Sequence, residues 1–204
     1  MTHNLSRSAF AAALLAAGAT AAVTTLASAS ASPHSAPSAP KTLTAARITR
    51  QTGTLAPGKV VGSSSLGQRV FVNAHDGFAL AAVGEAQYPA ETTDGGASWK
   101  TFGPALHVNA AQAPLSVTDL GAANARTVYY FGSGQAVDVT SNGGKTWWRT
   151  LCPELSLAVV PGISGRLVWI TQDTPTGGAA VTWPYESSDG GRVWHYTTAL
   201  GGGT

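Results

Sequence analysis

The sequence has little cysteine and little charge. Among its 204 residues there is one cysteine, Cys152, and Asp, Glu, Lys and Arg together make up 11%. A single cysteine excludes an internal disulfide framework, a dithiol redox pair and a cysteine-rich zinc site. It leaves Cys152 as a buried apolar residue, a free thiol, or one half of a bond to a partner outside this chain.

The charges that are present are balanced and scattered. The formal net charge is +2, and the lysines and arginines occur singly along the chain. Nucleic-acid binding by phosphate neutralisation needs a basic stripe or patch, which this sequence lacks. We therefore expect no nucleic-acid partner and no electrostatic docking to an anionic membrane surface.

Long apolar runs are confined to the N-terminus. Residues 9–26 are apolar and rich in alanine, and they are followed by small residues at Ala27-Ser28-Ala29. This pattern indicates a secretory signal peptide with an A-x-A cleavage site, over residues 1–29. An uncleaved membrane anchor is the alternative, because the run is nearly long enough to span a bilayer. A Ser/Ala/Pro-rich linker follows at 30–40. We expect a secreted chain that has no membrane contact once the signal is cleaved.

The remaining domain, residues 41–204, contains three variants of one eight-residue phrase. They read TTDGGASW from Thr92, TSNGGKTW from Thr140 and SSDGGRVW from Ser187. The Asp or Asn position recurs after 48 and then 47 residues. A fixed period of this size predicts a repeat architecture.

Each phrase has the chemistry of a tight turn. Glycine takes positive φ without steric cost, Asp and Asn side chains accept hydrogen bonds from nearby backbone N–H groups, and a preceding Ser or Thr can cap the same turn. The closing tryptophan is large enough to anchor the turn against a sheet. We assign this structural role to Thr92, Asp94, Gly96, Ser98 and Trp99; to Thr140, Asn142, Gly144, Thr146 and Trp147; and to Ser187, Asp189, Gly191 and Trp194.

The phrase resembles the Asp-box, S/T-x-D-x-G-x-T-W, also called the BNR repeat, of sialidases and other β-propeller proteins. The resemblance implies a hairpin lock inside a four-stranded blade, away from any active site. Two positions depart from the pattern: Asn142 replaces the Asp, and Val193 replaces the hydroxyl residue. The cadence of strand, strand and box is also similar to that of bacterial propellers of the photosystem II assembly factor-like type. A likeness between repeats transfers no activity.

The strand pattern repeats with the boxes. Apolar runs at 77–84, 126–132 and 166–171 predict buried strands, and further strands lead into and out of each box. We expect an all-β fold, a β-propeller-type array of about three to four antiparallel four-stranded blades at approximately 67–112, 113–155 and 156–204. A fourth unit without a box would have to come from 41–66.

The number of boxes is low for a propeller. Propellers close with four to eight blades, and this chain has three boxes. Three explanations stay open: truncation of a longer chain, closure by self-association through open blade edges, or a small degenerate propeller. Open sheet edges favour association in general.

No residue is assigned to catalysis, to a cofactor or to a metal. Sialidases, by resemblance, use an arginine cluster, a Tyr–Glu pair and an Asp, and they carry an Arg-Ile-Pro stretch. Arg47-Ile48-Thr49 lacks the proline, and the adjacent Tyr185-Glu186 would point to opposite faces of a strand. Each box supplies at most one carboxylate or amide, too few for a calcium loop.

Aromatic residues are the candidates for ligand stacking. Trp148 follows the tryptophan of the second box and should face the other way, whereas Trp183 and Tyr185 share one strand face. Pro184 between them predicts an edge strand that a sugar ring could reach. Packing between blades is the alternative role for all three.

These observations predict a secreted, non-enzymatic, propeller-like binding or scaffold protein that uses no cofactor. Its ligand would be a glycan or an envelope protein. The alternative is a fragment or a degenerate relative of a sialidase-like glycoside hydrolase.

Overall fold

The computed structural model describes residues 42–49, 53–106, 119–132, 136–152, 154–173 and 180–198. The expected signal peptide at 1–29 and linker at 30–40 lie outside these residues. Within the described ranges, no helix is both long enough and apolar enough to cross a membrane. Two 3-10 turns, η1 (Ser63–Ser65) and η2 (Ile163–Gly165), are the helical elements that the described residues contain.

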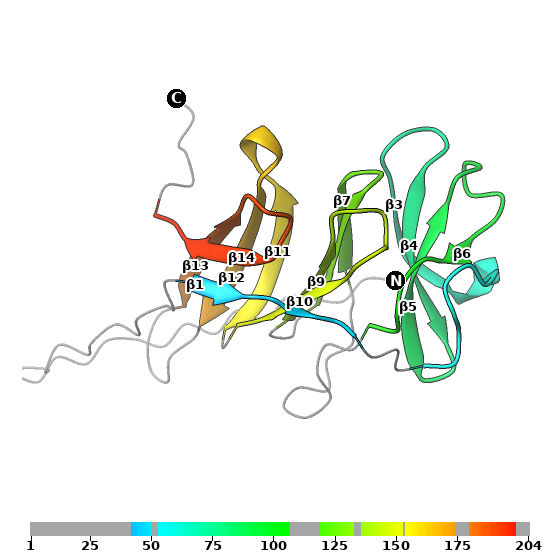
Figure 1. Ribbon diagram of the computed structural model, residues 1–204, viewed down its shortest axis with the longest axis horizontal. Helices are drawn as coiled ribbons and strands as arrows, with labels where there is room; N and C mark the ends of the chain where they lie inside the picture. The colour runs from blue at the N-terminus through cyan, green and yellow to red at the C-terminus, as the bar shows by residue number, and fades with distance from the viewer. Residues whose placement is uncertain are drawn as a thin grey trace, which may run out of the picture. The chain divides into compact units, whose positions relative to one another are not determined.

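The strands form three antiparallel sheets, which confirms the expected all-β, propeller-type array (Figure 1). Each sheet contains four strands that follow one another in the chain. The first sheet is built from β3 (Leu66–Phe71), β4 (Gly77–Val83), β5 (Ala86–Thr92) and β6 (Lys100–Thr101). The second is built from β7 (Asp119–Asn124), β8 (Thr127–Phe131), β9 (Ala136–Thr140) and β10 (Trp148–Leu151). The third is built from β11 (Leu155–Pro161), β12 (Leu167–Asp173), β13 (Val181–Ser187) and β14 (Val193–Tyr196).

The first strand of each meander lies on the inner side of the array. β7 is in contact with both β3 and β11, and the backbone N–H of Leu120 donates to the Gln68 side chain across the first two sheets, at 2.9 Å. The last strand of each meander, β6, β10 or β14, is therefore its outer strand. This radial order is the one found in propeller blades.

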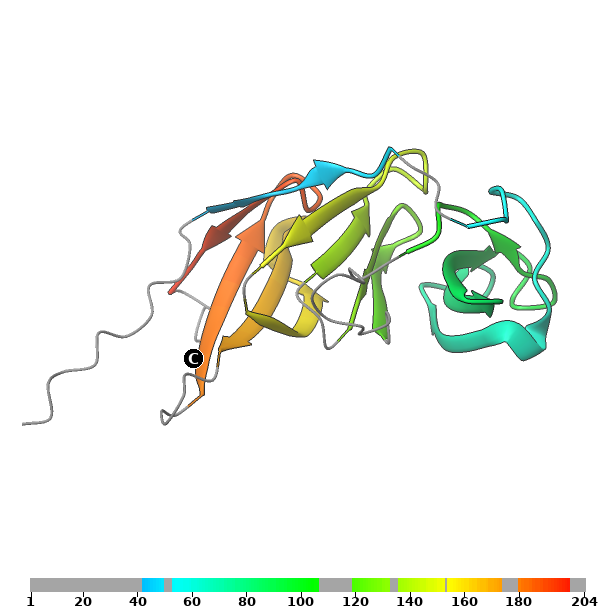
Figure 2. The same cartoon turned by 90° about the horizontal axis from the view of Figure 1, so that it is seen from below.

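The N-terminal segment runs along all three outer edges. We call residues 42–49 and 53–61 the strap. Its strand β1 (Thr42–Thr44) pairs with β14, β2 (Ala46–Arg47) pairs with β10, and Val60 forms a bridge to Lys100 of β6. The second and third sheets consequently have five strands rather than the expected four. Figure 2 shows β1 and β2 following the outer strands. Residues 41–66, from which a fourth blade would have to come, thus pair with the three existing sheets and form no sheet of their own among the described residues.

Apolar side chains fill the two spaces between sheets. Phe78, Phe102, Tyr130 and Trp147 belong to the core between the first two sheets, and the Tyr130 hydroxyl donates to the carbonyl of Ala79 at 3.1 Å. Between the second and third sheets the core includes the rings of Tyr129, Trp169, Tyr185 and Trp194. Burial of these aromatic rings is the main favourable contribution to the free energy of folding, at about 25 cal/mol per Å² of apolar surface removed from water.

The second sheet is enclosed on both faces. All five residues of β9 are buried, including Asp138, whose carboxylate accepts two hydrogen bonds from Arg149 at 2.7 and 2.6 Å. A buried carboxylate needs such pairing to offset its loss of hydration. One face of β9 carries Val137 and Val139, and the other carries Ala136, Asp138 and Thr140.

Candidate functional site

The three boxes form the hairpin turns before the outer strands. In box 1 (residues 92–99) the carboxylate of Asp94 accepts hydrogen bonds from the Thr92 hydroxyl at 2.7 Å and from the backbone N–H of Ser98 at 2.9 Å. The Thr92 hydroxyl in turn accepts from the backbone N–H of Gly96 at 2.9 Å. Box 3 (residues 187–194) repeats this pattern with Ser187, Asp189 and Gly191.

Hydrogen bonding sets the ionisation of the box carboxylates. Hydrogen bonds from the side chains of Ser98 and Thr92 are the main reason that the pKa of Asp94 is lowered. At Asp189, burial acts to raise the pKa, and hydrogen bonds led by the Val193 N–H outweigh it, so the pKa is lowered overall. Both carboxylates are consequently ionised and engaged in their own turns, which leaves them poorly suited to act as general acids.

Box 2 (residues 140–147) keeps the geometry with an amide. Asn142 Oδ1 accepts from the backbone N–H of Thr146 at 2.9 Å, and its Nδ2 donates to the Thr146 hydroxyl at 2.8 Å.

The tryptophans that close the three boxes are all buried, but they differ in the hydrogen bond that the indole N–H makes. Trp99 and Trp194 donate their indole N–H to the carbonyls of Gly96 and Gly191, whereas the buried Trp147 N–H has no partner among the described residues.

The aromatic candidates lie in different environments. Tyr185 is 0% exposed and packs in the core between the second and third sheets, so no ligand can stack on its ring. Trp183 is half-buried against the same core and in edge contact with Tyr196. Trp148 is half-buried on β10, opposite Arg47 of β2. The expected Trp183–Tyr185 platform is therefore not formed.

The edge-strand prediction from Pro184 was wrong. β13 lies inside the third sheet, between β12 and β14. Pro184 pairs in register with Ile170 of β12, and on its other side its carbonyl accepts from the backbone N–H of Thr197, just past the end of β14, at 3.0 Å. Because the N–H and C=O of one strand residue point to the same side, proline leaves this end of the β13–β14 pairing with one bond fewer.

Cys152 is a buried free thiol. Its S–H donates to the carboxylate of Glu154, which is also buried. Burial, together with the adjacent Glu154 carboxylate, raises the pKa of the thiol to about 12. The thiolate is the reactive form of cysteine, so this residue is not activated as a nucleophile.

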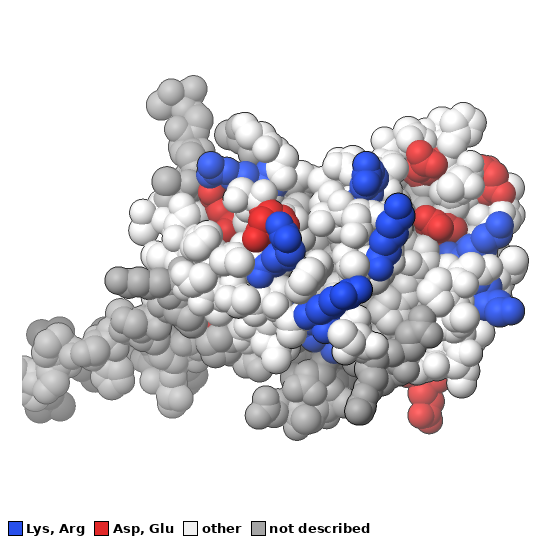
Figure 3. Space-filling view, viewed as in Figure 1, with Lys and Arg blue, Asp and Glu red and all other residues white. Residues whose placement is uncertain are grey.

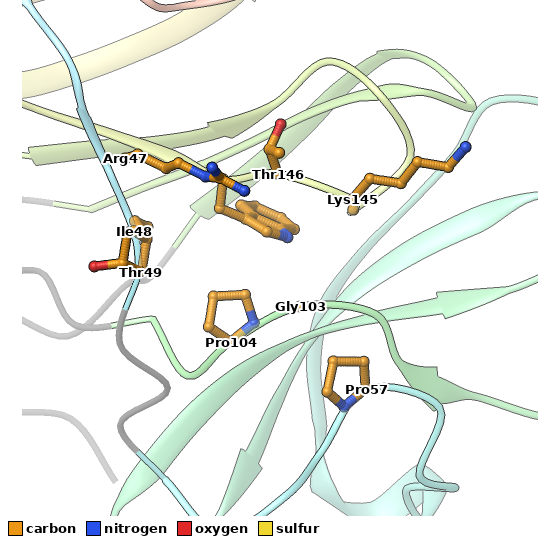
Figure 4. Close-up of a pocket in the computed structure, with 10 residues that line it drawn as sticks. Arg47, Ile48, Thr49, Pro57, Gly103, Pro104, Lys145 and Thr146 are labelled. Atoms are coloured by element: carbon orange, nitrogen blue, oxygen red, sulfur yellow. The ribbon is translucent and has the colours of Figure 1, made fainter.

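A cavity of about 190 Å³ lies where the strap passes between the first two sheets. Three separate segments line it: strap residues Arg47, Ile48, Thr49 and Pro57; the loop after β6 with Gly103 and Pro104; and the box 2 residues Gly144, Lys145, Thr146 and Trp147. Figure 4 shows Arg47 extending over the cavity toward Thr146, with Pro57 and Pro104 on the other side. Lys145 points away from the centre and stands at the rim.

The walls of the cavity depend on a close approach at Gly103. A Cβ at this position would lie 2.5 Å from the indole Nε1 of Trp147, so only glycine lets the ring pack here. The indole N–H of Trp147 is therefore buried against Gly103, and it has no partner among the described residues. A buried donor without an acceptor is unfavourable by about 1–3 kcal/mol, and native structures seldom keep one.

The cavity is positive. Both charged residues that line it, Arg47 and Lys145, are basic and exposed, and neither has an ion-pair partner among the described residues. Basic side chains cross the middle of the face in Figure 3, where β10 and the box 2 hairpin lie in Figure 1. The described part of the chain has no cluster of three or more His, Cys, Asp or Glu side chains that could hold a metal.

The sequence carries no local signal for this cavity. Arg47-Ile48-Thr49 resembles only an incomplete sialidase stretch, and box 2 shows only the chemistry of a tight turn. The cavity unites segments about 100 residues apart in the chain, and only the pairing of β2 with β10 brings Arg47 beside box 2. No local pattern of residues predicts that pairing.

Comparisons with known proteins yield little. No protein-family model matches the chain, and no curated protein matches it. A solved structure, "YCF48 bound to D1 peptide", is similar with 19% sequence identity and a TM-score of 0.42. The similarity covers 72% of this chain and 46% of that one, so the chain spans less than half of the length of that structure.

Proposed function

We propose that this chain is a secreted, non-enzymatic binding protein whose propeller-like sheets hold a ligand site in the cavity beneath the strap. The observation that carries the proposal is the composition of the cavity wall. Two basic side chains without ion-pair partners among the described residues, those of Arg47 and Lys145, line the cavity together with Thr49, Thr146 and the apolar groups of Ile48, Pro57 and Pro104. Polar groups that converge on a concave wall beside apolar side chains are typical of small-molecule sites.

Binding accounts for this wall better than hydrolysis does. Glycoside hydrolysis requires two carboxyl groups about 5–9.5 Å apart across the scissile bond. None of the residues that line the cavity carries a carboxyl group. The described carboxylates at Asp94, Asp138 and Asp189 are held by hydrogen bonds within their own hairpins.

A ligand screen by amide NMR of the full secreted chain tests the proposal. The library should contain small anions, neutral sugars and small cations. We expect at least one member to shift the amide signals of Ile48, Gly103 and Lys145, which all line the cavity. The variant Thr49→Phe should abolish these shifts by filling the entrance, because Thr49 is an exposed residue of the wall.

Thr44→Phe is the matched control, since Thr44 is also exposed on the strap but pairs with Val193 on the third sheet. It should bind like the unmodified chain. Shifts that survive in Thr49→Phe, or a library in which nothing shifts these amides, would remove the cavity as the ligand site. Hydrolysis of a fluorogenic sialoside by the purified chain would refute its non-enzymatic nature.

A further inference from the structure

We propose that Asn142 is a site of spontaneous deamidation and that box 2 sets the rate of the reaction by opening and closing. The proposal is independent of any ligand in the cavity. Asn142 is followed by Gly143, and asparagine reacts most readily before glycine, which has no side chain to hinder the approach of its own nitrogen. Boxes 1 and 3 carry aspartate at the same position, so the reaction converts box 2 to their form.

The chemistry needs water and no enzyme. The backbone nitrogen of Gly143 loses its proton and attacks Cγ of Asn142, the bond between Cγ and Nδ2 breaks, and Nδ2 leaves as ammonia. Water then opens the cyclic imide at either of its carbonyl carbons. Opening at one carbon gives aspartate, and opening at the other gives isoaspartate, in which the backbone runs through the side-chain carboxyl carbon. No group is oxidised or reduced.

The closed turn holds both reacting groups. The side-chain oxygen of Asn142 accepts from the backbone N–H of Thr146 at 2.9 Å and from the Thr140 hydroxyl at 3.2 Å, and Nδ2 donates to the Thr146 hydroxyl at 2.8 Å. The N–H that must lose its proton, that of Gly143, donates to the carbonyl of Arg126 at 3.0 Å. The amide must give up its bonds to turn toward this nitrogen. Deamidation therefore has to wait for local opening of the turn, as hydrogen exchange does.

The aspartate boxes share the restraint but not the reactivity. In box 1 the backbone N–H of Gly95 donates to the carbonyl of His75 at 2.9 Å, as Gly143 does in box 2. The carboxylates of Asp94 and Asp189, whose pKa values are lowered, stay ionised and are poor targets for a nucleophile. The neutral amide in box 2 is consequently the reactive member of the three.

The two products differ in whether the turn can close again. Aspartate keeps the acceptor for the backbone N–H of Thr146, as Asp94 does for Ser98 in box 1. Isoaspartate adds a backbone carbon to the turn, and Gly144 has no room to shift because it packs directly against the carbonyl of Phe102. The aspartyl box therefore closes with one added negative charge, whereas the isoaspartyl box stays open.

Mass spectrometry of the full chain, incubated at mildly alkaline pH in buffer and in urea, tests the proposal. We expect the peptide that contains Asn142 to convert from amide to acid roughly tenfold faster, or more, in urea, where the turn is open. Thr146→Val removes the hydroxyl that holds Nδ2. It should speed conversion in buffer about fivefold, the factor for one hydrogen bond of about 1 kcal/mol, and leave the rate in urea unchanged. Box 3 carries Val193 at this position, so the variant should fold.

A matched control and a direct substitution complete the design. Thr182→Val makes the same change at an exposed position of β13, outside box 2, and should leave the rate in buffer unaltered. Equal rates in buffer and urea, or no acceleration by Thr146→Val, would overturn control by the turn. Failure of Asn142 to convert in urea would overturn the site itself. Asn142→Asp should retain protection of the Gly143 amide from hydrogen exchange, and loss of that protection would refute reclosure of the aspartyl box.

Discussion

Two adjacent glycines in box 2 show how strongly a single position can be constrained. Both have positive φ, 68° at Gly143 and 77° at Gly144, which costs any other residue roughly 1 kcal/mol. A Cβ on Gly143 would meet nothing within 4 Å, whereas one on Gly144 would lie 2.3 Å from the carbonyl oxygen of Phe102. Only Gly144 is therefore fixed by both backbone conformation and contact with the first sheet.

Substitution by alanine separates these two effects. We expect Gly143→Ala to lower the free energy of unfolding by about 1 kcal/mol, from the backbone alone. Gly144→Ala should cost about 3 kcal/mol, because the Phe102 backbone or the whole turn must move as well. Chemical denaturation of the two variants measures the difference. Similar losses would mean that the loop after β6 moves away freely.

The Asp94 carboxylate makes box 1 sensitive to acid. Hydrogen bonds from Ser98 and Thr92 lower its pKa in the folded state. A lowered folded pKa contributes stability above the unfolded value, about 4, and this stability is lost as the pH falls toward the folded value. Asn142 fills the same position in box 2 without ionising. Asp94→Asn should therefore lessen the fall in melting temperature between about pH 4 and pH 2. An identical fall in the variant would show that protonation of Asp94 does not weaken the turn.

Between elements, the closing tryptophans differ in what they join. The Trp194 N–H donates to the Gly191 carbonyl in its own hairpin and to the hydroxyl of Thr150 on β10, at 3.2 and 3.1 Å. Box 3 thus connects the third sheet to the second through a buried hydrogen bond. The Trp147 N–H has no such partner among the described residues.

Replacing each tryptophan by phenylalanine isolates that connection. Both substitutions remove similar volume from a buried site, but only Trp194→Phe removes hydrogen bonds. We expect Trp194→Phe to be more destabilising than Trp147→Phe by about 1–2 kcal/mol, at the usual net value of about 1 kcal/mol per bond. Thermal denaturation of the pair measures this. Equal costs would indicate that the Trp147 N–H has an acceptor, such as a water molecule.

The sequence predicts the strands well where the signal lies in neighbouring residues, as it does beside each box. The period of the boxes and the apolar runs predicted three antiparallel sheets, and β5, β9 and β13 each lead into a box as expected. The strap was not predicted, because Thr42–Thr44 and Ala46–Arg47 are too short to show a strand pattern. Pro184 did not predict the position of β13 for a related reason: that position depends on which strands pair on either side of it, and no local pattern of residues shows this pairing.

At the scale of the whole molecule, the strap protects the array. It covers the outer edges β6, β10 and β14 with backbone hydrogen bonds, including those from Ala45 N–H to the Arg192 carbonyl and from Thr101 N–H to the Lys59 carbonyl. Its Val61 and Leu55 also cover the remaining apolar face of the first sheet, around Trp99. Unpaired outer edges are the kind of surface on which sheets associate. The association that open blade edges would favour should therefore be suppressed while the strap is docked.

Removing β1 and β2 tests this role. A chain that begins after residue 49 would expose the edges of β10 and β14 and uncover Trp194, against which Leu43 is paired. We expect it to form dimers or larger assemblies by size-exclusion chromatography with light scattering, and to lose protection of β14 amides from hydrogen exchange. The full-length variant Leu43→Asp should show the same loss of protection to a smaller degree, because Leu43 is the buried residue of β1. A truncated chain that stays monomeric, with unchanged exchange in β14, would show that the strap does not guard the edges.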